Sequence, residues 1–196
     1  MRSAAAFGLN EVFLVDANHK KMSKFGSQGT ADKMNYTIFE GLKDVKRYCN
    51  EKKLSICGVE IIEGAQPIQN HPFKGDTVFM LGNEGTGLNQ NQIDVCDQFV
   101  YIPQYTDKTA SLNVAIAGSI IFHHFGLWAG YSEHSREGFK YEITDYKGED
   151  ERSVVTYITY DENGQQTNAT NETDKIRQER ATKKERECAQ SGIPFM

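Results

Sequence analysis

A glycine-rich segment directly follows an apolar, strand-like run at residues 79–90, FMLGNEGTGLNQ. Gly82, Gly85 and Gly87 give the backbone freedom to take positive φ angles and to approach a ligand closely. Their spacing is neither the G-x-G-x-x-G dinucleotide pattern nor a phosphate loop, which would end in Lys-Ser/Thr. Because Glu84 is a poor neighbour for a triphosphate, the segment favours a cationic or neutral ligand. An ordinary strand-to-helix turn would explain this segment, taken alone, equally well.

Strand-like and helix-like segments alternate through the first two thirds of the chain. Apolar or β-branched runs predict strands at 11–15, 54–61, 76–81 and 98–102. Helical patterns predict helices at 2–8, 41–53, 89–96 and 112–128, the third beginning at Asn89 as its cap. This alternation indicates an α/β fold with a largely parallel sheet, in which ligands bind at the carboxyl ends of the strands.

The composition changes near residue 132 and divides the chain into two predicted parts. Residues 1–132 form the predicted domain and carry 12 basic against 13 acidic residues. Residues 133–196 form a polar extension with 10 basic and 14 acidic residues, which we expect to be partly disordered. Within it, 153–160 has strand composition, whereas 174–187 lacks an apolar stripe and indicates a solvated helix or disorder.

A second polar loop, at 103–111, joins the end of a strand to an unusually apolar helix. Pro103 makes a rigid turn, and we expect Ser111 to cap the helix that follows. Asn113 sits in the first turn, where an amide often bonds to nearby backbone. The helix at 112–128 is apolar on nearly every side, which predicts burial in a core or an interface. Two strand-end loops of this kind together predict one pocket.

The cysteines and histidines argue against a metal site. Cys49, Cys57, Cys96 and Cys188 form no CxxC pair and no zinc-type cluster with histidine. Packed, reduced thiols predict a reducing compartment, so we expect a cytoplasmic protein, with a nuclear or organellar location left open. The pair at 123–124 indicates a core or interface role rather than a ligand pair. No apolar run reaches the roughly 18 residues of a membrane span, and the start shows no signal-peptide pattern, so we expect no membrane partner.

Three segments in order resemble the motifs of one enzyme family. MLGNEGTGL and IPQYTDKTASLNVAIA look like the second and third motifs of the SpoU/TrmH branch of the SPOUT RNA methyltransferases, and RSAAAFGLNEVFLV looks like the end of the first. The likeness covers residues 2–130, and FVYIPQY and HHFGLWAGYSE are similar to a eukaryotic subgroup. It implies an α/β fold with a C-terminal trefoil knot, a homodimer, and methyl transfer from S-adenosyl-L-methionine to a ribose 2′-hydroxyl of tRNA or rRNA.

The resemblance assigns a cofactor-binding role to five positions. Gly82, Ile102 and Leu112 match the family's cofactor contacts, and Leu81 and Gln104 are expected neighbours. Gln104 stands where the family commonly has Met. Backbone groups at strand ends would then read the adenine and ribose without charged side chains.

The resemblance also implies four catalytic positions: Arg2, Glu84, Ser111 and Asn113. Arg2 is expected to bind the RNA phosphate beside the target ribose, because a guanidinium can engage phosphate through two donors. Glu84 is expected to orient the loop or to pair with Arg2. Ser111 and Asn113 are expected to hydrogen-bond the cofactor or the ribose. No metal is implied, because a sulfonium methyl donor needs no Lewis acid.

The start of the first motif departs from the family pattern. An Asn and a Gly normally come several residues before the arginine and follow a strand, but Met1 stands immediately before Arg2. A missing strand predicts an unpaired sheet edge. Basic clusters at 18–24 and 43–47 indicate either RNA contacts or a solvated face. Two alternatives therefore stay open: a non-catalytic RNA-binding or interaction protein that keeps the fold, and a generic nucleotide-binding domain.

Overall fold

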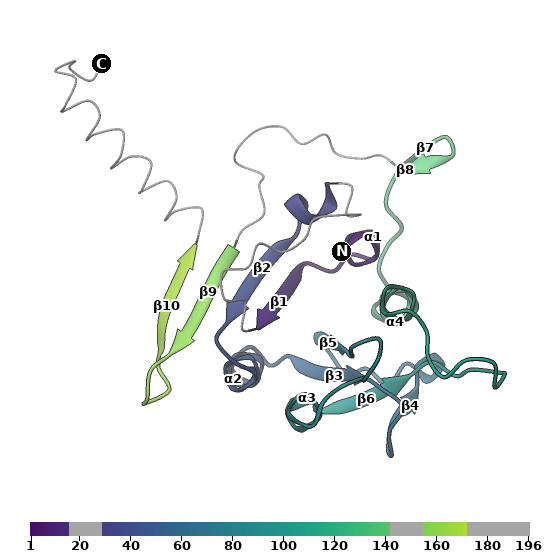
Figure 1. Ribbon diagram of the computed structural model, residues 1–196. Helices are drawn as coiled ribbons and strands as arrows, with labels where there is room; N and C mark the ends of the chain where they lie inside the picture. The colour runs from purple at the N-terminus through teal and green to yellow at the C-terminus, as the bar shows by residue number, and fades with distance from the viewer. Residues whose placement is uncertain (16–28, 142–154, 172–196) are drawn as a thin grey trace, which may run out of the picture.

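The structure of the protein is a computed structural model that describes residues 1–15, 29–141 and 155–171 (Figure 1). Its described strands form two four-stranded sheets, with the orders β1-β2-β9-β10 and β4-β6-β3-β5, and one small hairpin, β7-β8. Pairing is parallel throughout the two sheets except between β9 and β10. The predicted α/β class with mostly parallel strands is therefore confirmed.

The first sheet joins the N-terminal part of the chain to the polar extension. It contains β1 (Glu11–Val15), β2 (Asn35–Phe39), β9 (Val155–Tyr160) and β10 (Gln166–Asn171). The strand predicted at 153–160 is confirmed over β9, which pairs in parallel with β2. Ile158 of β9 is buried in one core cluster with Phe39 and Val45. The extension thus supplies strands to this sheet. The domain boundary near residue 132 stays a prediction, as does the solvated helix or disorder expected at 174–187, which lies outside the described residues.

The second sheet carries the strand ends that matter for function. It contains β3 (Ser55–Val59), β4 (Gln66–Pro67), β5 (Thr77–Leu81) and β6 (Gln98–Tyr101). Ile56, Cys57 and Val100 are fully buried. Gly58 permits tight packing, since a Cβ there would lie 2.5 Å from the Phe99 ring. Strands β3, β5 and β6 run in the same direction, so their carboxyl ends meet at one edge of the sheet.

The four helices predicted within residues 1–132 are confirmed, with small shifts at their ends. They are α1 (Arg2–Ala6), α2 (Leu42–Lys52), α3 (Gln90–Val95) and α4 (Val114–Ala129), with short 3-10 turns at Thr30–Lys33 and Ile68–Asn70. Helix α2 buries Val45 and Cys49 on one face. Helix α3 begins at Asn89, whose side chain forms a reciprocal capping box with Gln92. The small hairpin consists of β7 (Arg136–Glu137) and β8 (Lys140–Tyr141).

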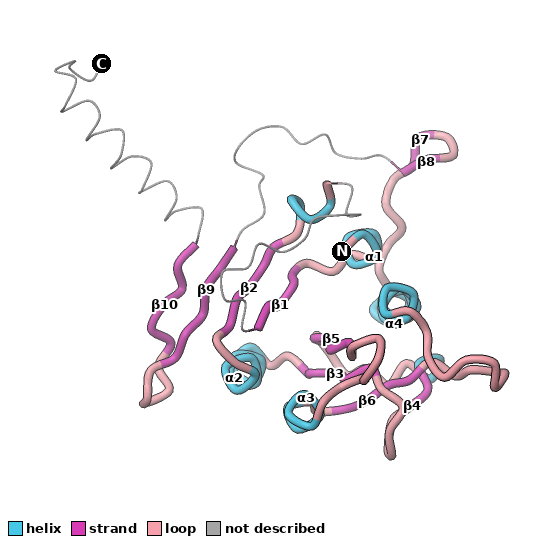
Figure 2. The backbone as a smooth tube through the Cα atoms, viewed as in Figure 1, coloured by secondary structure: helices cyan, strands magenta, loops and turns pink. Residues whose placement is uncertain are grey.

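The prediction that Ser111 caps the long helix is wrong. Helix α4 begins two residues later, and the Asn113 side chain accepts hydrogen bonds from the backbone N–H groups of Ala115 and Ile116. Asparagine and serine are both good caps, so local sequence does not separate them. Helix α4 packs beside α1 (Figure 2). The hydroxyls of Ser119 on α4 and Ser3 on α1 are 2.6 Å apart. None of the described helices is both long and apolar enough to cross a bilayer.

A cavity separates the two sheets along β1 and β5. Among the described strands, β1 pairs on one side with β2, β5 pairs on one side with β3, and neither has a partner on its other side. Both strands line a cavity of about 580 Å³ whose walls also include Met1 and parts of α4. Within the described residues, β1 and β5 are therefore the edge strands that face this cavity.

Candidate functional site

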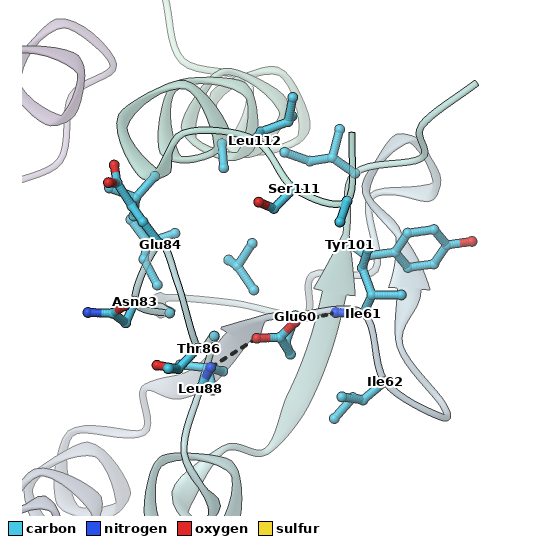
Figure 3. Close-up of a pocket in the computed structure, with 18 of the residues that line it drawn as sticks. Glu60, Ile61, Ile62, Asn83, Glu84, Thr86, Leu88, Tyr101, Ser111 and Leu112 are labelled. Atoms are coloured by element: carbon cyan, nitrogen blue, oxygen red, sulfur yellow. Dashed lines mark hydrogen bonds between the residues drawn. The ribbon is translucent and has the colours of Figure 1, made fainter. Parts of the chain in front are cut away.

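Three segments at the carboxyl edge of the second sheet enclose a cavity of about 440 Å³ (Figure 3). One is the glycine loop (82–88), which follows β5. Another is the serine loop (102–113), which follows β6, and the third is the turn 59–62 at the end of β3. The first two turns of α4 close the remaining side through Val114 and Ala117. The prediction that the glycine and serine loops converge on one pocket is therefore confirmed by the geometry.

Hydrogen bonds hold the glycine loop in a tight hairpin. The backbone N–H of Asn83 donates to the Gly87 carbonyl at 3.1 Å, and the N–H of Gly87 donates to the Asn83 carbonyl at 2.9 Å. Gly87 has φ +66°, a left-handed conformation that favours glycine. A Cβ on Gly82 would lie 2.7 Å from the carbonyl carbon of Gly87, whereas one on Gly85 would meet its nearest atom at 3.6 Å. Gly82 and Gly87 are thus required by the geometry, and Gly85 is not.

A side-chain contact joins the glycine loop to the start of α4. The amide nitrogen Nδ2 of Asn113 donates to Oε1 of Glu84 at 2.6 Å, while Oδ1 of Asn113 caps the helix. Both polar atoms of the Asn113 amide are therefore hydrogen-bonded. The described contacts do not include the ion pair between Glu84 and Arg2 that was offered as one alternative. Glu84 accepts a hydrogen bond from Asn113 instead, and Arg2 is exposed on α1 and does not line the cavity.

Glu60 is a cavity residue that the sequence analysis did not identify. It follows β3 directly, and its carboxylate accepts hydrogen bonds from the backbone N–H groups of Ile61 at 3.0 Å and Leu88 at 2.9 Å (Figure 3). The carboxylate thereby ties the turn 59–62 to the glycine loop. One signal was available: Glu60 is an acid near the carboxyl end of the apolar run 54–61 that was predicted as a buried strand.

The predicted site residues divide into a group at the cavity and one residue outside it. The cavity lining includes eight predicted or newly identified positions: Glu60, Leu81, Gly82, Glu84, Ile102, Gln104, Ser111 and Leu112. Ser111 turns its hydroxyl toward the cavity (Figure 3). Asn113 lies at the rim through its bond to Glu84. Arg2 is the one predicted position that the structure leaves apart, and the chemical role of each residue stays a prediction.

The basic cluster on α2 is largely engaged in contacts within the protein. Lys46 forms an ion pair with Asp97, and the Arg47 guanidinium lies 4.6 Å from the ring centroid of Tyr160. These contacts favour a structural reading of this cluster over an RNA-binding one. The cluster at 18–24 lies outside the described residues.

The described cysteines and histidines make packing contacts. Cys49, Cys57 and Cys96 are free thiols, and burial raises the pKa of Cys57 to about 12 and that of each of the other two to about 11. Nε2 of His71 and Nδ1 of His124 are 2.9 Å apart, and burial lowers the pKa of His124, as does the neighbouring His71. Within 1–15, 29–141 and 155–171, no three His, Cys, Asp or Glu side chains gather in a way that could hold a metal ion.

Comparison with known proteins identifies relatives that match a little under two thirds of the chain. The sequence model of the SpoU rRNA Methylase family matches residues 1–123. The 23S rRNA (guanosine-2′-O-)-methyltransferase RlmB of Acinetobacter baylyi is 29% identical over 130 residues, which are 63% of this chain and 51% of that protein. The 23S rRNA (guanosine(2553)-2′-O)-methyltransferase RlmP of Bacillus subtilis is 28% identical over 138 residues, 63% of this chain and 50% of that protein. The chain thus spans about half the length of these curated relatives.

Solved structures share the fold at lower identity. The TrmH/SpoU tRNA modifying enzyme of A. aeolicus has a TM-score of 0.58 at 20% identity, covering 66% of each chain. The SpoU methyltransferase AviRb of Streptomyces viridochromogenes, solved in complex with AdoMet, has a TM-score of 0.57 at 20% identity and covers 67% of this chain and 52% of its own. At these identities the likeness establishes the fold alone.

Proposed function

Because this chain belongs to the SpoU rRNA methylase family, we propose that it transfers a methyl group from S-adenosyl-L-methionine to a ribose 2′-hydroxyl of rRNA or tRNA. The observation that carries this proposal is the convergence of the glycine loop and the serine loop on one cavity. The names of the two curated relatives favour rRNA over tRNA as the substrate class.

The chemistry of the cavity fits this cofactor. Two carboxylates, Glu60 and Glu84, are among the residues that line it, and none of those residues carries a basic side chain. Such a cavity suits a sulfonium cation and disfavours a polyphosphate. Gly82 and Gly87 keep the loop backbone free of Cβ atoms, so its amides and carbonyls can contact a ligand closely. We assign cofactor binding to Leu81, Gly82, Ile102, Gln104 and Leu112.

The bound cofactor supplies an electrophilic methyl group, and the protein's contribution is to position the acceptor. Ser111, with its hydroxyl toward the cavity, can hydrogen-bond the ribose or the cofactor. Asn113 and Glu84 hold the two loops in a fixed relation, which limits the error in alignment between acceptor and methyl group. We assign RNA phosphate binding to Arg2, which lies on the exposed side of α1 where a polyanion has access.

A binding and transfer assay tests this function directly. The protein should bind S-adenosyl-L-methionine in calorimetry and transfer a labelled methyl group to RNA, leaving a linkage that resists alkaline hydrolysis. The position of Arg2 outside the cavity favours a second candidate, a non-catalytic RNA-binding protein that keeps the fold. Cofactor and RNA binding without methyl transfer would support this second candidate and overturn the first.

We further propose that the active form is a knotted homodimer, located in the cytoplasm, that uses α4 as its interface. Ile116 and Leu127 lie on one face of α4 and are 54% and 60% exposed. Exposed His123 lies on the same face and contacts the ring of Phe7 from α1. An apolar helix face of this kind is typical of a surface covered by another chain. The trefoil knot is what the resemblance to the SpoU/TrmH branch implies, and a knot that includes the serine loop would keep this loop beside the glycine loop.

A further inference from the structure

The cavity carries acidic side chains that the turns around it do not need for their fold, because a strand-to-helix turn can be built without a carboxylate. The residues that line the cavity include Glu60 and Glu84 and no basic side chain. Glu84 turns to Asn113 at the rim, whereas Glu60 lies at the base of the cavity between the turn 59–62 and the glycine loop (Figure 3). Glu60 therefore brings a formal charge to the inner wall, where any ligand in the cavity would meet it.

The surrounding backbone keeps the Glu60 carboxylate in one place. One oxygen accepts from the N–H of Ile61 and the other from the N–H of Leu88. The second oxygen also lies against Gly87, where a Cβ would come within 2.3 Å of it. Gly87 thus leaves the space that the carboxylate occupies. Two hydrogen bonds and this close packing make Glu60 a fixed charge rather than a mobile surface acid.

We propose that Glu60 is a specificity-determining residue that makes the cavity prefer the positively charged methyl donor to its uncharged thioether product. This inference rests on the proposed function. Methyl transfer converts the sulfonium of S-adenosylmethionine into the neutral sulfur of S-adenosylhomocysteine, so the ligand loses one positive charge while its shape changes by one methyl group. A fixed negative charge in a cavity of reduced dielectric attracts the donor more than the product. Because the neutral product lacks this attraction to the Glu60 carboxylate, it binds more weakly than the donor and is released more readily.

Calorimetric titration with both ligands tests this preference. The quantity to compare is the ratio of the Kd for S-adenosylhomocysteine to the Kd for S-adenosylmethionine. In Glu60→Gln, which keeps the side-chain length, the ratio should fall by about three- to tenfold, as expected for one charge removed at several ångströms. Glu63→Gln is the matched control, because Glu63 is an exposed acid of the adjoining loop that does not line the cavity.

The outcomes separate this inference from the proposed function. An equal loss of affinity for both ligands in Glu60→Gln would mean that Glu60 only supports the loop, and would overturn the inference alone. A wild-type protein that binds neither ligand would overturn both. Should Glu60→Gln fail to fold, salt titration of the wild type carries the test: the ratio should fall as salt rises from 50 to 500 mM, by about twofold or more. A salt-independent ratio would contradict the charge-based preference.

Discussion

The side-chain amide of Asn113 connects two functional loops, capping α4 through its oxygen and donating to Glu84 of the glycine loop through its nitrogen at 2.6 Å. Helix capping and loop positioning therefore share one residue. The two roles can be separated by substitution. Capping α4 requires only a side-chain acceptor at position 113, whereas the contact with Glu84 requires a donor on a side chain as long as that of asparagine.

Replacement of Asn113 should separate stability from catalysis. Asn113→Ala removes the cap and should lower the free energy of unfolding by about 1 kcal/mol. Asn113→Ser keeps a good cap but has a shorter side chain, so stability should stay close to wild type while methyl transfer falls by about ten- to a hundredfold. Denaturant unfolding and the RNA methylation assay measure the two effects. Full activity in Asn113→Ser would show that the contact with Glu84 is dispensable.

The glycine loop offers a matched pair of substitutions. Gly82→Ala places a Cβ 2.7 Å from the carbonyl carbon of Gly87, so the hairpin must open, at a cost of about 1–3 kcal/mol. Gly85→Ala meets its nearest atom at 3.6 Å, an ordinary contact. Calorimetry should find cofactor binding weakened by at least about tenfold in Gly82→Ala and nearly unchanged in Gly85→Ala. Equal effects in both variants would contradict the assigned geometry.

Acid should weaken the contact between α2 and the second sheet through Asp97. Burial opposes ionisation of Asp97, but hydrogen bonds from Lys46 and from the backbone N–H of Ile56, with the Lys46 charge, lower its pKa overall. A lowered folded pKa contributes stability that is complete above the ordinary carboxyl value of about 3.9 and is lost as the pH falls through the folded pKa.

The acid dependence can be measured by comparing wild type with Asp97→Asn. We expect the melting temperatures of the two proteins to differ at pH 7 and to converge as the pH falls below about 4. The effect should be modest, because the Lys46 and Asp97 side chains are 30% and 41% exposed and solvent screens the pair. A difference that is constant across this pH range would rule out Asp97 titration as the cause.

The described thiols should be unreactive in the folded protein. Burial raises the pKa of Cys57 to about 12 and those of Cys49 and Cys96 to about 11, well above the ordinary thiol value of about 8.5. At pH 8 these residues hold little of the thiolate that reacts with disulfide reagents. A Cys188→Ser variant, which removes the thiol outside the described residues, should therefore react only after unfolding. Rapid labelling of the native variant would show that these side chains are accessible.

The exposed face of α4 should control assembly. Ile116→Asp and Leu127→Asp each place a charge on an apolar surface that a second copy would cover, so each should shift a dimer toward monomer in sedimentation equilibrium by at least about tenfold in Kd. Phe139→Asp is the control, because Phe139 is a fully exposed aromatic residue of the β7-β8 turn. A dimer that withstands both α4 substitutions would place the interface elsewhere.

Most secondary structure followed from local signals. The apolar runs of β3, β5 and β6, the face of α2 that buries Val45 and Cys49, and the capping box of Asn89 and Gln92 are all visible in neighbouring residues. The cofactor-site expectation followed from a motif resemblance, and seven of its nine residues line the cavity, while Asn113 is joined to its rim by the hydrogen bond to Glu84. Arg2 was expected with them and lies apart, because its helix is placed by packing against α4 rather than by its own sequence.

The sequence alone determined the strands β1, β3, β5, β6 and β9, the glycines that follow β5, and the loops that carry small polar residues, because these depend on side chains a few residues apart. It did not predict β2, β4 or β10. The tertiary structure decided that Glu60 faces the glycine loop, that Asn113 rather than Ser111 caps α4, and that β9 pairs with β2. Each of these depends on contacts between residues distant in the chain, or on a choice between near-equal local alternatives. Such contacts arise only when the sheets and helices pack, and so no local pattern specifies them.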